Sequence, residues 1–243
     1  MAKIALSGYF LSVASGLATG LAVMMAVDVS AADAPVSEAA QRAEGAGQWS
    51  EAVRLHRAQA AAEPTRSDLW VRISDIEVRL GNTNAAIAAL QSAIKAAPSD
   101  PTLHARLSRT YSVAGQPLQG LKAMEAALSL APASFEYLKA RAELANWLGR
   151  PATAADSYRR MLDIRPDDAP LRLLLARARS WSGELDSSSN DYADYVVQHP
   201  DEAVALLEYA RVESWRGNFT HAIELLDRYE RKFGDPKLVA KER

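Results

Sequence analysis

The chain of 243 residues contains no cysteine. This absence excludes disulfide frameworks, thiol nucleophiles, cysteine-ligated zinc and iron–sulfur sites, and the acylated cysteine of a lipoprotein. Neither sign of charge dominates, because 28 Lys and Arg residues stand against 30 Asp and Glu residues and leave a formal charge of −2. No overall positive field draws such a chain onto nucleic acid or anionic lipid. We therefore expect no nucleic-acid partner.

Histidine is also scarce. No pair of the four histidines has metal-ligand spacing, and they fall far apart in the chain at His56, His104, His199 and His221. The sequence also lacks a glycine-rich phosphate loop and a G-x-S-x-G nucleophile turn, and its carboxylates are scattered. The sequence therefore predicts a non-enzyme, with no catalytic residue, no cofactor and no metal.

The amino terminus, residues 1–34, has the pattern of an export segment. Lys3 precedes the run 4–27, which carries no charge, and small residues dominate the tract 29–34. A basic start, an apolar run and small residues at its end are typical of a secretory signal. An uncleaved anchor is the alternative, because the run is long enough to span a bilayer. Both alternatives export the rest of the chain, so we expect a periplasmic protein whose only membrane contact is this segment, if it stays uncleaved.

Beyond this segment the sequence repeats every 34 residues. One column is glycine, at Gly47, Gly81, Gly115, Gly149, Gly183 and Gly217. Another is proline, at Pro64, Pro98, Pro132, Pro166 and Pro200. Two further columns hold small residues: Ala40, Ser74, Ser108, Ala142, Ala176 and Ala210; and Ala52, Ala86, Gly120, Ala154, Ser188 and Ala222. Four columns in register indicate a repeat architecture.

Each period indicates two helices. Apolar residues recur at three- and four-residue steps over 69–80 and again over 85–96. Gly81 separates the two runs, and glycine tolerates the left-handed turn that ends a helix. Pro98 closes the unit. No alternating apolar and polar run of four or more residues indicates a strand. We expect the small columns to lie where helices cross closely.

A helix–turn–helix of this length, with a small residue at repeat position 8, glycine at 15, a small residue at 20 and proline at 32, resembles the tetratricopeptide repeat. Trp70 also occupies the family's position 4. The resemblance implies an all-α, right-handed solenoid of about six 34-residue repeats over residues 35–236, followed by a tail at 237–243. The units run approximately over 33–66, 67–100, 101–134, 135–168, 169–202 and 203–236.

The last units depart from the family's pattern. Serines fill 187–189, where the second helix of unit 5 should be apolar, and large residues replace the usual alanine of position 27 at Met161, Tyr195 and Tyr229. These changes either loosen the solenoid or fit it to a neighbour. The outer face of the last helix, with Ile223, Leu226 and Tyr229, is either partly uncovered or capped by the short tail.

In the family, the first helix of each unit lines a concave groove. Carried over by repeat position, the candidate groove residues are Arg109, Lys139, Asn146, Trp147, Arg177, Ser180, Trp181, Arg211, Ser214 and Trp215. Trp and Arg are frequent binding hot spots, so the three tryptophans in a row favour a binding surface. The alternative is that each tryptophan wedges between adjacent first helices. Lys139 and Asn146 alone echo the family's carboxylate clamp, and they share one unit.

The segment 175–183 (Leu-Ala-Arg-Ala-Arg-Ser-Trp-Ser-Gly), and nearly also 209–217, resembles repeats of exported proteins of exopolysaccharide synthesis and secretion. We expect a non-catalytic periplasmic scaffold that binds a segment of a cell-envelope protein in its groove. The alternative is a component of an exopolysaccharide system that contacts glycan through its Trp and Arg residues, with a polysaccharide or an outer-membrane barrel as partner.

Overall fold

The structure, a computed structural model, describes residues 29–234. Twelve α-helices and no strand make up this part of the chain. The first helices of successive pairs are α2 (Val29–Gly45), α4 (Ser67–Arg79), α6 (Pro101–Val113), α8 (Phe135–Trp147), α10 (Ala169–Ser182) and α12 (Ala203–Trp215). The second helices are α3 (Trp49–Ala62), α5 (Thr83–Ala96), α7 (Pro117–Leu130), α9 (Pro151–Ile164), α11 (Leu185–Gln198) and α13 (Phe219–Phe233).

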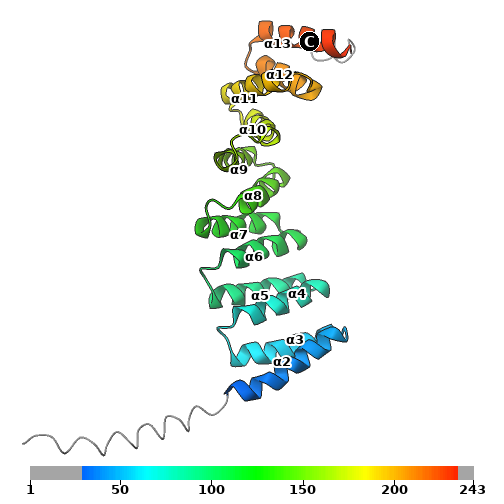
Figure 1. The fold of residues 1–243 in the computed structure, drawn as a ribbon, viewed down its shortest axis with the longest axis vertical. Coiled ribbons are helices and arrows are strands. Elements are labelled where there is room, and N and C mark those ends of the chain that lie inside the picture. Colours follow the sequence, from blue (N-terminus) through cyan, green and yellow to red (C-terminus); the bar gives the residue numbers. More distant parts are fainter. Residues whose placement is uncertain (1–28, 235–243) are drawn as a thin grey trace, which may run out of the picture.

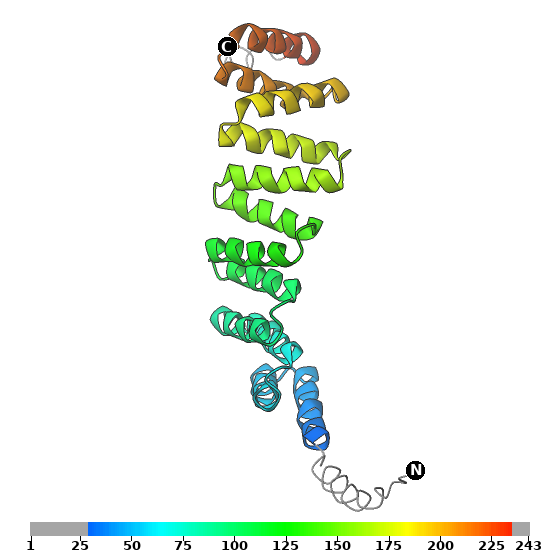
Figure 2. The ribbon, with the colours of Figure 1, turned by 90° about the vertical axis from the view of Figure 1, so that its left-hand side faces the viewer.

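The helices form one elongated stack in chain order, from α2 at one end to α13 at the other (Figure 1). Within the described chain, extensive packing joins only helices that are consecutive in sequence. The stack twists along its length, since α3 lies lengthwise in Figure 1 and nearly end-on in Figure 2, whereas α10 does the reverse. The predicted all-α repeat solenoid is confirmed.

Most of the predicted signal or anchor, and the whole of the predicted tail, lie outside the described residues. Within 29–234, no helix combines the length and the apolar character that crossing a bilayer requires.

The glycine column produces the turn inside each pair. Gly81 has a φ of 79°, a conformation that costs other residues energy, and the N–H of Asn82 then donates to the carbonyl oxygen of Glu77 at 2.8 Å. The same bond from the residue after the glycine recurs at Gln48–Ala43, Gln116–Tyr111, Arg150–Ala145, Glu184–Arg179 and Asn218–Glu213. All six glycines of the column have positive φ, so the predicted left-handed turns are confirmed.

Both columns of small residues are buried where the two helices of a pair meet. Gly120 shows how little space is left, because a Cβ there would lie 3.0 Å from the carbonyl oxygen of Ser108 on the facing helix. A larger side chain in these columns would force the helices apart, as the sequence predicted.

The departures in the last units are absorbed by contacts within the chain. Ser188 and Ser189 lie buried in α11. The hydroxyl of Ser188 donates to the carbonyl oxygen of Ala176 at 2.8 Å, and that of Ser189 donates to the carboxylate of Glu213 at 2.5 Å. The three large residues of position 27 are buried as well, at Met161, Tyr195 and Tyr229.

Of the three residues that the sequence placed on the outer face of the last helix, two do not lie on that face. Leu226 and Tyr229 are buried, because they face back onto α12 and join the apolar cluster that contains Leu206. Ile223 is 48% exposed, and Phe219 lies exposed on the same helix.

Candidate functional site

The three predicted tryptophans stand at the ends of three successive first helices, where their side chains reach solvent. The exposed fraction is 60% for Trp147, 74% for Trp181 and 52% for Trp215. The rings of Trp181 and Trp215 have centroids 6.1 Å apart and planes inclined at 59°. These rings contact each other while leaving more than half of their surface open.

Four hollows follow one another along the first helices of the described chain, at the four junctions between units from α4 to α12. The first lies between α4 and α6 (about 580 Å³), the second between α6 and α8 (about 510 Å³), the third between α8 and α10 (about 470 Å³) and the fourth between α10 and α12 (about 90 Å³). The same repeat positions line all four. The second helix of the earlier unit contributes one equivalent residue to each: Leu90, Met124, Tyr158 and Tyr192.

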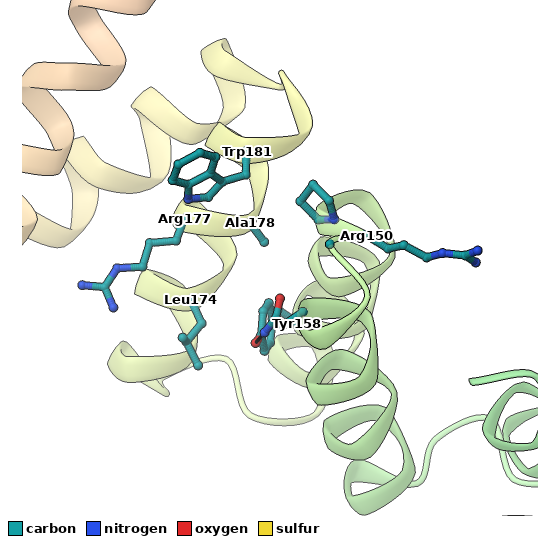
Figure 3. Close-up of a pocket in the computed structure, with 9 residues that line it drawn as sticks. Arg150, Tyr158, Leu174, Arg177, Ala178 and Trp181 are labelled. Atoms are coloured by element: carbon teal, nitrogen blue, oxygen red, sulfur yellow. Dashed lines mark hydrogen bonds between the residues drawn. The ribbon is translucent and has the colours of Figure 1, made fainter. Parts of the chain in front are cut away.

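The outer wall of each hollow is the residue of position 13. It is Val113 in the first hollow, Trp147 in the second, Trp181 in the third and Trp215 in the fourth. Figure 3 shows the third hollow, where Leu174, Ala178 and Trp181 of α10 face Tyr158 of α9. The wall of a hollow is therefore aromatic from the second hollow onward.

The polar side chains beside the tryptophans use their donors inside the protein. The amide of Asn146 donates to the hydroxyl of Tyr158 at 2.7 Å, and burial raises the pKa of that tyrosine. The hydroxyl of Ser180 donates to the carbonyl oxygen of Arg177 at 2.7 Å, and that of Ser112 donates to Ser108 at 3.0 Å. The hydroxyl hydrogens of Ser180 and Ser112 are therefore used within the protein, whereas Asn146 keeps one of its two amide N–H groups.

The fourth hollow is small because a polar network fills it. The Nε of Arg177 donates to both carboxylate oxygens of Glu208, at 3.1 and 2.8 Å, and the hydroxyl of Tyr192 donates to the same carboxylate at 3.2 Å. Burial and the nearby carboxylate raise the pKa of Tyr192, so it stays a neutral donor. In Figure 3 the guanidinium groups of Arg177 and Arg150 extend away from the third hollow.

The structure brings most of the predicted groove residues together. Those that line one or more of the four hollows are Arg109, Asn146, Trp147, Arg177, Ser180, Trp181, Arg211 and Trp215. Lys139 and Ser214 line none of them. Residues of repeat positions 6 and 24, such as Leu174 and Tyr158, line the hollows and were missed by the sequence analysis. These residues recur every 34 residues at equivalent positions of successive units, and this regularity was the signal that could have identified them.

A buried ionic cluster lies apart from the groove tryptophans, at the first junction. His56 Nε2 is 2.6 Å from Glu44 Oε1, and Arg72 binds both oxygens of the same carboxylate. Arg72 balances the charge of Glu44, so burial dominates and lowers the pKa of His56. Within the described chain, no group of His, Asp and Glu residues has an arrangement that could hold a metal ion.

Comparison with protein-family models gives two matches, both described as tetratricopeptide repeat, over residues 43–109 and 106–169. A search of curated proteins finds no match. Many solved structures share the fold. YrrB, a TPR protein with an unusual peptide-binding site, is 17% identical with a TM-score of 0.56, over 76% of this chain and 96% of that chain.

A tetratricopeptide repeat protein from Parabacteroides merdae is 18% identical with a TM-score of 0.52, over 81% of this chain and 78% of that one. A chain of the Naa15/Naa10 complex bound to HypK-THB is 19% identical with a TM-score of 0.65, over 86% of this chain and 35% of that one. At these identities the likeness is one of fold.

Proposed function

Because the chain belongs to the tetratricopeptide repeat family, whose fold serves as a scaffold for protein interactions, we propose that it is a non-catalytic adaptor that holds a segment of a partner protein in the groove of its first helices. The proposal concerns the surface made by α6, α8, α10 and α12, where the four hollows succeed one another.

The observation that carries this proposal is the exposure of three tryptophans in three consecutive hollows. A large aromatic side chain left more than half exposed at one place is unusual, and three in a row form an apolar surface that a partner can cover. Tryptophan dominates binding hot spots because it buries a large, rigid area at little cost in conformational entropy. The groove is therefore suited to a ligand with apolar side chains.

We also propose that the adaptor works in the periplasm. The support is the sequence of residues 1–34, in which Lys3 precedes the uncharged run 4–27 and small residues follow. Its partner would then be a protein of the cell envelope.

Glycan binding by an exopolysaccharide component is the second candidate, and the exposed face of Trp181 favours it, since an indole can stack on a sugar ring. A polysaccharide or an outer-membrane barrel would then be the partner. Sugar sites also need hydrogen-bond donors beside the ring. Ser180 uses its only donor within the protein and Asn146 uses one of its two N–H groups, which leaves few donors beside the tryptophan rings and favours a protein segment over a glycan.

The test is photo-crosslinking in living cells. A photoreactive amino acid replaces Lys139, which lies exposed on α8 without lining a hollow, and in a matched control it replaces Val197, which is exposed on α11. Both are repeated in a chain with Trp147→Ala, Trp181→Ala and Trp215→Ala, after circular dichroism has shown that this chain stays helical.

A defined protein that crosslinks at position 139, does not crosslink at 197 and disappears with the tryptophans would support the adaptor. A polysaccharide with the same behaviour would support the second candidate. Equal crosslinking with and without the tryptophans would exclude the groove as the binding surface.

A further inference from the structure

We propose that the groove takes one extended protein segment that inserts two large apolar side chains into the second and third hollows, with an acidic side chain opposite Arg109 and a basic one opposite Glu143. This inference rests on the proposed function and specifies the chemistry of the partner. Its basis is a charged contact that recurs between units and is missing at the two junctions that α6, α8 and α10 form.

The recurring contact joins position 9 of one unit to position 6 of the next, 31 residues later. Asp75 pairs with Arg106 at 3.0 Å, and Arg177 pairs with Glu208 at 2.8 Å. The two pairs have opposite polarity. The geometry of the solenoid therefore holds an ion pair at this place whichever sign stands first.

At the two central junctions the second member of the pair is apolar. Arg109 stands 31 residues before Ala140, and Glu143 stands 31 residues before Leu174. Neither Arg109 nor Glu143 makes a hydrogen bond or ion pair with another residue of the described chain, and both are exposed. The central groove thus presents one cation and one anion, each without its partner.

The same two junctions also hold large hollows that are walled by tryptophan. Where Glu208 fills the place, the fourth hollow shrinks to about 90 Å³. Where Ala140 and Leu174 fill it, the second and third hollows keep about 510 and 470 Å³ and are walled by tryptophan. The first hollow is larger still, at about 580 Å³, although the Asp75–Arg106 pair lines it, so an ion pair at this place does not by itself close a hollow; no tryptophan lines the first hollow. Two adjacent hollows are therefore both open and aromatic.

Charges of both signs favour a polypeptide as the occupant. An acidic polysaccharide carries one sign of charge and can satisfy Arg109 but repels Glu143, whereas a peptide satisfies both. An extended peptide advances about 3.3 Å per residue and points alternate side chains to one side, so side chains two, four or six residues apart span about 7, 13 or 20 Å. One of these spacings must match the distance between the two hollows.

The test uses fluorescein-labelled peptides of Ser and Gly that carry two Phe residues two, four or six positions apart, with Asp beside one Phe and Lys beside the other, in both orders. The matched control peptides have Ser in place of both Phe. Binding is measured by fluorescence anisotropy on the protein purified as its expression host makes it.

Two variants, called the closing variants, each supply the missing ion-pair partner of one groove charge and place a charged side chain where the wall of one hollow is now apolar. Ala140→Glu faces Arg109, and Leu174→Arg faces Glu143, in the geometry of the two native pairs. Val197→Glu adds a charge on exposed α11 and serves as the control. Thermal midpoints are measured for all three. A fourth variant, Arg109→Glu, alters an exposed charge and keeps the test decisive if a closing variant unfolds.

We expect at least one spacing to bind about tenfold or more tightly than its Ser control, and each closing variant to remove about that factor, as loss of a hot spot does. Val197→Glu should leave the affinity unchanged, and Arg109→Glu should favour peptides with Lys in place of Asp. The proposal is overturned if no Phe peptide exceeds its control, or if Ala140→Glu and Leu174→Arg are folded and bind as tightly as the native chain.

Alginate, an anionic polysaccharide, is tested alongside, and preferential binding of alginate that the closing variants abolish would also overturn the proposal. The outcomes of the peptide-binding test can be distinguished from those of the crosslinking test. A protein captured at position 139 without any peptide binding leaves the adaptor standing and rejects this description of its ligand.

Discussion

Gly183 ends α10 with a φ of 87°, in the left-handed region that side chains with a Cβ disfavour. Gly183→Ala should therefore lower the free energy of unfolding by about 1 kcal/mol. Gly45, the last residue of α2, has no positive φ and open space around its Cβ position. Gly45→Ala should be neutral or stabilise by up to about 1 kcal/mol. Thermal unfolding followed by circular dichroism checks both, and effects of the same sign would contradict the prediction.

His56 makes the stability of the first junction depend on pH. Burial lowers the pKa of His56 below its usual value of 6.5. At a pH between the pKa of His56 in the folded chain and its higher pKa in the unfolded chain, only the unfolded chain binds a proton at His56. The stability that the neutral, buried His56 contributes is therefore present above pH 6.5 and is lost as the pH falls below it. Denaturation in urea at pH 7.5 and pH 5.5 should show the loss.

In His56→Gln the part of the pH dependence that His56 contributes should disappear, and an NMR titration of His56 should give a midpoint below 6.5. A midpoint above 6.5 would mean that the charge of Glu44 outweighs burial.

The sequence predicts no ligand role for the histidines, but it could not reveal this cluster. Glu44, His56 and Arg72 come from three helices, and only their packing brings them together.

At the scale of the helix, α11 accommodates adjacent buried serines in different ways. The hydroxyl of Ser188 adds a bond to a carbonyl of α10, and four of the other five units hold alanine at this position. Ser188→Ala should therefore change stability by less than about 0.5 kcal/mol. The hydroxyl of Ser189 bonds the buried carboxylate of Glu213. Ser189→Ala should cost about 1–3 kcal/mol, because it removes a donor from a buried charge.

Glu213 keeps two other donors, Arg216 and Asn218, both at 2.7 Å. Burial alone would raise the pKa of Glu213, but its three hydrogen bonds hold that pKa below the usual value. The difference between the two serine variants is measured by thermal unfolding. Equal losses would show that the bond from Ser189 to Glu213 contributes no more than that from Ser188.

The helices themselves could be predicted from the sequence, because each depends on local signals that recur every 34 residues. The glycine turns and the small columns act within one unit, and six copies make the pattern visible. The groove could be predicted only in outline. Whether the residue at position 9 has an ion-pair partner depends on the residue at position 6 of the next unit. The two observed pairs, Asp75–Arg106 and Arg177–Glu208, have opposite polarity, so no single residue type marks the contact. The contacts between units had to be seen to identify the open hollows.

At the scale of the whole molecule, a stack in which each unit touches only its neighbours has ends that differ from its middle. Position 21, on the second helix of each unit, shows the difference. It is buried at Val53, Ile87, Leu121, Ala155 and Ser189. Its sixth member, Ile223, is 48% exposed. The burial of one repeat position thus depends on where its unit stands in the stack.

The same substitution at this position should therefore cost much more stability within the stack than at its carboxyl-terminal end. Ile87→Glu places a carboxylate in a site with 8% exposure and should cost about 3 kcal/mol or more, because the charge loses most of its hydration there. Ile223→Glu keeps its carboxylate in water and should change stability by less than about 0.5 kcal/mol. Thermal midpoints of the two variants decide the matter. A large loss in Ile223→Glu would mean that a contact absent from the described residues covers α13.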